Sequence, residues 1–262
     1  MQNVTSIENF TKFKNVQVGT SEEEVRIDLA ACYRLIALYG MTDLAANHVT
    51  VRVPGTEDHF FINPYGMLYE EITASSLHKI DLEGNLIERG HPHYGVNTAG
   101  YVIHSAVHSA RRDVACVLHT HTRAGVAVSC LKDGLLPINQ TALQLHDQLA
   151  YHEFEGPATK PEEKVRLVQD LGDKQLMILR NHGLLACGRT IPEAFFNMYT
   201  LNEACEIQVS VMATGGAIHR PSNYAMEEQH SLMSFIRTVP RGNLEWASLR
   251  RKVDRLLPGY EA

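Results

Sequence analysis

The chain has 262 residues, of which 44% are hydrophobic, and its formal net charge is −6. This length and composition suffice for one large globular domain with a substantial core. The acidic balance argues against nucleic acid as a partner, because binding to phosphates requires a basic face. No apolar run reaches the roughly 18 residues that a membrane-spanning helix needs, so we expect no membrane partner. The 5 cysteines include no C-x-x-C pair, which favours a reducing cytoplasm over a disulfide framework.

The N-terminal half of the chain predicts a loose arm, two helices and several short strands. Residues 1–20 lack periodicity and form the expected arm, while Ser21 and Glu24 have the spacing of a capping box that begins a helix. Strands are expected where apolar and polar residues alternate. The expected elements are a helix over 25–39, antiparallel strand pairs within 47–63 and 77–87, and a helix over 98–110.

Two short apolar runs in the second half, 114–118 and 175–179, are typical of strands buried on both faces. The elements expected around them are helices over 122–131, 160–171 and 190–213, a strand over 184–187 and a connecting segment over 140–146. This order predicts an α/β domain with a mixed sheet and helices on both faces. We place its body at residues 21–220, followed by a helical tail, 221–262, packed on the same domain with Trp246 as its anchor.

Three histidines stand where they could meet at one edge of this sheet. His119 and His121 follow the first apolar strand, and residues two apart on an extended backbone point to the same side. His182 follows the second apolar strand, beside Gly183, whose freedom lets the backbone turn sharply. Neutral imidazoles are zinc ligands, and a catalytic zinc site has three protein ligands and one open position. We therefore predict that the three rings converge from two neighbouring strand ends on a divalent ion, preferably Zn²⁺, with Fe²⁺ or Mn²⁺ as alternatives.

Two other histidine pairs have spacings that a metal site could use. His104 and His108 lie four apart on an expected helix, but no glutamate follows His104 to complete an H-E-x-x-H pattern. His91 and His93 flank a proline in an expected loop, where exposed or substrate-facing imidazoles are the simpler interpretation. Both pairs remain alternatives to the predicted triad.

Five segments resemble motifs of the class II aldolase/adducin family, in the same order. Residues 112–122 resemble the zinc-binding core, 181–183 the "NHG" motif, 47–52 the "GNISVR" segment, 62–66 the "ITPTG" turn, and 80–85 the "VDLDGN" hairpin. The resemblance covers about residues 21–215. It implies a three-layer α/β/α fold with a central mixed, largely antiparallel sheet. It also implies a cytoplasmic homotetramer with sites at subunit interfaces, and a metal held by His119, His121 and His182.

The resemblance also implies where this chain departs from an aldolase. In the aldolases of the family, zinc polarises a ketose carbonyl and a glutamate in a "PSSE" motif acts as acid/base. By its distance from the His-x-His pair, that motif falls on residues 97–100, so Gly100 stands in the place of the glutamate. Such proton-transfer groups contribute roughly 10²–10⁴-fold, so sugar-phosphate aldolase activity is not expected. The segment is more similar to the adducin-type branch.

Candidate residues around the metal follow from the same comparison of motifs. Asn47, Tyr65, Gly66 and Thr98 are the candidate substrate-binding residues, and Tyr65 and Tyr101 are candidates for the missing acid/base. Each has a structural alternative, since Asn47 could end a loop and the two tyrosines could serve packing. A neighbouring subunit or the tail near the C-terminus could also contribute to the site.

Three functions remain open at this point. The first is metal-dependent lyase chemistry (aldol cleavage, decarboxylation or dehydration) on a small oxygenated carbonyl or carboxylate substrate. The second is a non-catalytic, adducin-like interaction domain, which the loss of the glutamate favours and the retained histidines disfavour. The third is a non-haem iron oxygenase, because three histidines can bind Fe²⁺ as well as Zn²⁺.

Overall fold

The computed structural model describes residues 19–156, 161–238 and 240–262, apart from the side chains at positions 98, 99 and 161. Within these residues eight strands form one sheet in the order β4-β3-β2-β1-β5-β8-β7-β6. Neighbouring strands are antiparallel except β6 and β7, which are parallel. The strands are β1 (His48–Arg52), β2 (His59–Ile62), β3 (His78–Asp81), β4 (Leu86–Glu88), β5 (Cys116–Thr120), β6 (Leu149–His152), β7 (Leu176–Leu179) and β8 (Gly183–Gly188).

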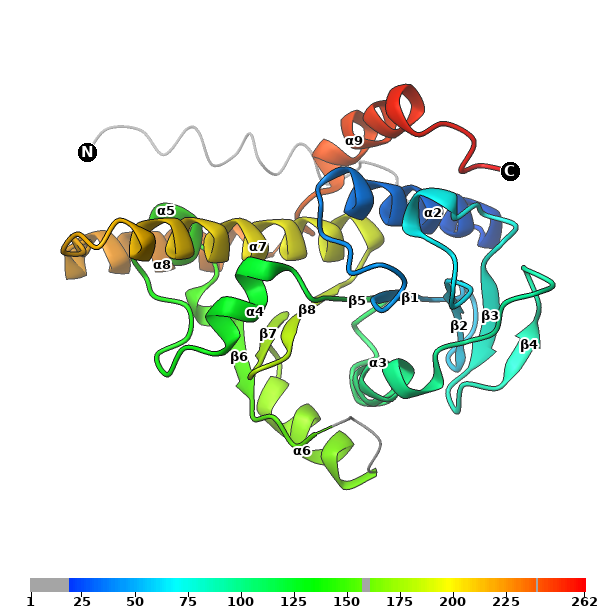
Figure 1. Cartoon of the computed structure of the whole chain (residues 1–262), viewed down its shortest axis with the longest axis horizontal. Helices are drawn as coiled ribbons and strands as arrows, with labels where there is room; N and C mark the ends of the chain where they lie inside the picture. Colours follow the sequence, from blue (N-terminus) through cyan, green and yellow to red (C-terminus); the bar gives the residue numbers. More distant parts are fainter. Residues whose placement is uncertain (1–18, 157–160, 239) are drawn as a thin grey trace.

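Helices cover both faces of the sheet, as Figure 1 shows. The helices are α2 (Glu22–Leu38), α3 (Thr98–Ala110), α4 (Arg123–Ser129), α5 (Gln140–Leu143), α6 (Pro161–Leu171), α7 (Ile191–Ala213), α8 (Asn223–Ile236) and α9 (Asn243–Leu256), with short 3-10 turns η1 (Tyr69–Glu71) and η2 (His146–Gln148). One face packs against α2, α4 and α7, and the other against α3 and α6. The prediction of a three-layer α/β/α fold with a mixed, largely antiparallel sheet is confirmed. Within the described residues no helix combines the length and hydrophobicity of a membrane span.

Alternate side chains of β5 pack into the two hydrophobic cores on opposite faces of the sheet. Cys116 and Leu118 belong to the core beneath α2 and α7, whereas Val117 belongs to the core beneath α3 and α6. Because successive side chains of a strand point to opposite faces, His119 shares the side of Val117. The register of the neighbouring strand sets His48 of β1 directly opposite His119. The site is therefore built on the α3 side of the sheet.

The structure differs from the sequence prediction in three places. The first buried strand is displaced by two residues, because β1 and β8 pair with it as far as His119 and Thr120. Strand β6 lay in no predicted element, since it is only four residues long and pairs with a single neighbour, β7. The two apolar strands, β5 and β7, are not adjacent as predicted, because β8 lies between them.

The C-terminal segment is fastened to α2 by buried polar contacts. Trp246 of α9 donates its indole N–H to Asp28, with 2.8 Å between Nε1 and Oδ1. Arg34 donates to the carbonyls of Ile72, Leu257 and Pro258. Tyr260 is 1% exposed and its hydroxyl donates to Asp254. These contacts join the tail to α2. The division into an arm over 1–20, a domain over 21–220 and a tail over 221–262 stays a prediction, and residues 1–18 lie outside the described residues.

We expect Arg34→Met to loosen this tail without unfolding the sheet. The variant keeps the length of the side chain but leaves three carbonyls without their donor, at a cost of about 1–3 kcal/mol. Limited proteolysis with mass spectrometry should detect faster cleavage after residue 240 than in the wild type. Unchanged protection of the tail would contradict this prediction.

Candidate metal centre

The three predicted ligands meet at one edge of the sheet. His119 is the fourth residue of β5, His121 follows the strand by one residue, and His182 lies in the turn between β7 and β8. The Nε2 atoms of His119 and His121 are 2.8 Å apart, and those of His121 and His182 are 3.0 Å apart. No other group of three or more metal-ligating side chains in the described part of the chain is gathered as closely.

Contacts behind two of the rings fix which nitrogen carries the proton. Nδ1 of His119 lies 2.8 Å from the carbonyl oxygen of Leu184, and Nδ1 of His121 lies 3.0 Å from Oδ2 of Asp43. A carbonyl and a carboxylate only accept, so each Nδ1–H donates and each Nε2 of the neutral rings bears a lone pair. Two lone pairs that face each other at 2.8 Å repel, whereas a cation between them would be coordinated by both. The donor set therefore fits a divalent ion such as zinc.

Burial favours the neutral form of two of the proposed ligands, His119 and His182. Desolvation, followed by the neighbouring imidazoles, holds the pKa of His119 well below its usual value. Burial and His121 lower the pKa of His182 to about 4. The neutral ring is the form that binds a metal, so these two ligands need to release no proton at neutral pH.

The prediction that Gly183 makes the sharp turn next to His182 is wrong. Asn181 takes the left-handed conformation, with φ of 55°, and supplies the sharp turn. A Cβ on Gly183 would instead stand 2.5 Å from the carbonyl oxygen of Thr120 and 3.1 Å from the ring of His121. Gly183 is therefore needed for the close approach of β8 to the ligand rings, not for backbone freedom.

The ring of His48 lies against Gly100, the position at which the resemblance predicts the family's glutamate. A Cβ on Gly100 would lie 2.6 Å from Cε1 of His48, closer than real Cβ contacts. The ring is held there, because Nε2 of His48 donates to the carbonyl of Gly100 at 2.7 Å and the ring packs on His104 and His119. Burial lowers the pKa of His48 to about 4. A glutamate at position 100 would therefore require the ring of His48 to shift.

The alternative pair, His104 and His108, lies in the core. Thr50 Oγ1 is 2.7 Å from Nδ1 of His104 and 2.7 Å from Nε2 of His108, and both histidines are fully buried. The ring of His108 stacks on Phe60 with the centroids 4.3 Å apart. Both imidazoles serve a buried hydrogen-bonded cluster, which favours the structural interpretation of this pair.

The candidate substrate residues fall into two groups. Asn47 immediately precedes β1, is 1% exposed, and has no hydrogen-bond partner for either amide atom among the described residues. Tyr65 is 49% exposed and its backbone N–H donates to Gly95. Gly66 has φ of 115°, and an added Cβ would lie 2.8 Å from the ring of Tyr94. Asn47 is thus a free buried amide beside the strand that pairs with β5, whereas Tyr65 and Gly66 form an adjoining turn.

Two further candidates are placed differently. The side chain of Thr98 lies outside the described residues, and its backbone begins α3 behind the N-cap Asn97. Tyr101 is 2% exposed and donates its hydroxyl to the backbone carbonyl of Asp81 at 3.0 Å. The described contacts bring neither Tyr101 nor Tyr260 to the three histidines, so we do not carry Tyr101 forward as an acid/base.

Two site residues escaped the sequence analysis. His48 occupies the position of the asparagine when "GNISVR" is read letter by letter against residues 47–52, so the register of the motif could have identified it. Asp43 contacts His121 from the loop before β1, and no sequence pattern links positions so far apart.

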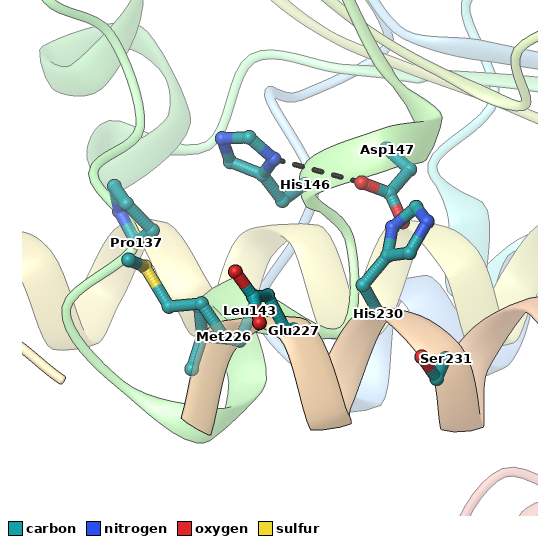
Figure 2. A pocket seen from close by; sticks show the side chains of 8 residues that line it. All are labelled: Pro137, Leu143, His146, Asp147, Met226, Glu227, His230 and Ser231. Atoms are coloured by element: carbon teal, nitrogen blue, oxygen red, sulfur yellow. Dashed lines mark hydrogen bonds and ion pairs between the residues drawn. The ribbon is translucent and has the colours of Figure 1, made fainter. Parts of the chain in front are cut away.

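A separate hollow of about 410 Å³ lies between the α5–η2 segment and α8, and Figure 2 shows its lining. Asp147 is one of the two acidic residues in its lining, and its carboxylate already accepts from His230 at 2.5 Å and pairs with Arg237 at 3.4 Å. None of the three ligand histidines lines this hollow. We assign no function to it.

Comparison with known proteins agrees with this geometry. Residues 27–209 match the family model described as "Class II Aldolase and Adducin N-terminal domain". The chain belongs to the class II aldolase and adducin family. A Pseudomonas aeruginosa protein whose name places it in aldolase class 2 is 47% identical over 98% of this chain and 99% of its own length. Mouse alpha-adducin is 45% identical over 81% of this chain, which spans 29% of that longer protein.

Solved structures show the same fold. An aldolase II superfamily protein from Pseudomonas syringae has a TM-score of 0.89 and 44% identity, covering 94% of this chain and 98% of that one. An L-fuculose 1-phosphate aldolase from Glaciozyma antarctica has a TM-score of 0.78 and 25% identity, covering 98% of this chain and 94% of that one. The family therefore includes proteins named as aldolases and proteins named as adducins, and the site must decide between them.

Proposed function

We propose that this protein binds a divalent ion, preferably Zn²⁺, through His119, His121 and His182 and performs lyase-type chemistry on a small oxygenated carbonyl or carboxylate substrate. The observation that carries the proposal is the convergence of three Nε2 atoms, two of them with tautomers fixed from behind. When bound, the ion would supply Lewis-acid polarisation of a substrate oxygen. Aldol cleavage, decarboxylation and dehydration all use such polarisation.

The residues around the three histidines limit which substrate contacts and which proton-transfer groups the proposed reaction could use. Asn47 offers a buried amide with both atoms free, which can bind the polar end of a substrate. Tyr65, Gly66 and Thr98 remain proposed substrate contacts. The contact between His48 and Gly100 disfavours a carboxylate in the place of the family's acid/base. Proton transfer would then use Tyr65, water, the substrate or a group from another subunit. This arrangement supports a reaction other than sugar-phosphate aldol cleavage.

A non-catalytic, adducin-like role is the second candidate. The blocked acid/base position and the 45% identity with mouse alpha-adducin favour it. Exposed apolar side chains on α7 and α8, including Met212, Tyr224 and Phe235, support a homo-oligomer, which we propose to be a tetramer. Four of the five free cysteines are buried, which supports a cytoplasmic location. Light scattering after size-exclusion chromatography tests the oligomer.

Metal analysis of the triad variants tests the first proposal. We expect about one Zn²⁺ per chain in protein purified with added zinc, and near-complete loss in His119→Ala, His121→Ala and His182→Ala. His104→Ala serves as the control, because that ring bonds Thr50. Calorimetry of the zinc-loaded protein with glycolate, pyruvate and hydroxyacetone then asks whether small oxygen ligands bind. A folded oligomer that takes up no metal would favour the assembly role and overturn the lyase proposal.

A further inference from the structure

Two of the proposed ligands, His119 and His121, differ in the group that accepts a hydrogen bond from their Nδ1 atom. His119 donates to the backbone carbonyl of Leu184, whose place is set by the pairing of β5 with β8. His121 donates instead to a side chain, the carboxylate of Asp43, at 3.0 Å. Asp43 lies in the loop between α2 and β1, and its side chain is 49% exposed. It can therefore be replaced without altering a ligand or emptying the core.

The loop that carries Asp43 has an unfavourable backbone. Leu44, the next residue, has φ of 47°, in the left-handed region that costs a non-glycine residue of order 1–3 kcal/mol. Its side chain is 78% exposed, so packing does not offset this cost. The same short loop leads to Asn47 and β1. A strained turn without compensating packing supports a role in which the loop conformation fixes the position of a side chain. The side chain in question is Asp43, which contacts His121.

We propose that Asp43 is a positioning residue for the metal centre, holding His121 with Nε2 toward His119 and His182 and thereby raising the affinity for a divalent ion. This inference rests on the proposed function. A carboxylate behind a ligand histidine fixes the tautomer and ring orientation and makes the ligand nitrogen more basic. Loss of such an outer partner typically weakens metal binding by about 10–100-fold. A mere surface ion pair between the same groups would leave metal binding unchanged.

Zinc titration of full-length Asp43 variants tests the proposal. The dissociation constant for Zn²⁺ is measured by competition with a chromogenic chelator for the wild type, Asp43→Ala and Asp43→Asn. We expect about 10–100-fold weaker binding for Asp43→Ala and a smaller loss for Asp43→Asn, whose amide oxygen still accepts the bond without the charge. Asp133→Asn, an exposed loop aspartate, is the matched control and should bind like the wild type.

Thermal unfolding of the metal-free variants separates positioning from a structural role. We expect the metal-free melting temperatures of Asp43→Ala and the wild type to agree, because the carboxylate is half exposed. If Asp43→Ala bound zinc more weakly and also had a lower metal-free melting temperature than the wild type, a general loss of stability would explain the weaker binding. That result would overturn the proposal. So would wild-type affinity in Asp43→Ala. A wild-type protein that binds no zinc at all would overturn the proposed function itself, so the two failures are distinguishable.

Discussion

Restoring the family's glutamate by Gly100→Glu is expected to destabilise the protein by about 3 kcal/mol or more rather than to restore aldolase activity. The new Cβ would meet Cε1 of His48 at 2.6 Å. Moving His48 aside would break its hydrogen bond to the carbonyl of Gly100 and its packing against His104. Overpacking costs about 1–3 kcal/mol, and a buried, unpaired carboxylate adds to that cost. Urea unfolding measures the loss.

A double variant shows whether His48 is the cause. His48→Asn places the family's smaller residue at this position, so Gly100→Glu should cost at least about 1 kcal/mol less in that background. Gly95→Ala is the control, because an added Cβ there meets nothing within 4 Å. Equal costs of Gly100→Glu in both backgrounds would show that His48 does not exclude the glutamate.

The unfolding free energy is expected to fall steeply as the pH drops below about 6.5, and His108 should carry a measurable part of this fall. Burial, and then the charge of Arg52, lower the pKa of His108 to about 3. Between the ordinary histidine pKa of about 6.5 and this lower value, the unfolded state binds a proton that the folded state does not. The contribution of His108 to the unfolding free energy is therefore fully present above about pH 6.5. It decreases by about 1.4 kcal/mol per pH unit between pH 6.5 and the lowered pKa of about 3.

Urea unfolding of the metal-free protein from pH 7.5 to pH 4.5 measures this dependence. His108→Phe keeps the ring that stacks on Phe60 but cannot bind a proton, so its stability should decrease less steeply than that of the wild type. The variant should also lose about 1 kcal/mol at neutral pH, because Thr50 loses one hydrogen bond. His219→Gln, an exposed position, should retain the wild-type slope. Identical slopes for His108→Phe and the wild type would contradict the prediction.

Periodicity and spacing predicted the layers and the convergence of the three histidines but not the details of their environment. The apolar runs and the His-x-His spacing were sufficient to place His119 and His121 on one side of a buried strand, because alternation is a local property. Strand β6 was missed, since four residues at a sheet edge carry little pattern of their own. The position of β8 between β5 and β7 depends on pairing across the whole sheet, which local patterns do not encode.

The site illustrates the same limit. The roles of His48, Asp43 and Gly183 arise from contacts between segments far apart in sequence. A glycine after a histidine suggested a flexible turn, but Asn181 adopts the left-handed conformation instead. Only packing could show that Gly183 makes room for the carbonyl of Thr120. Such steric demands have no signature in a single sequence.

The order of strands in the sheet separates the three proposed ligands from several of the residues around them. Strands β1 to β4 come from residues 48–88 and strands β5 to β8 from residues 116–188, and the two sets join only where β1 pairs with β5. All three ligand histidines belong to the second set, whereas Asp43, Asn47 and His48 come from the border of the first. Under the proposed function, substitutions at the border of the first set would change the surroundings of the ion without replacing any of its three proposed ligands. A sheet divided in this way would let the environment of the proposed metal site vary while its three histidines are kept.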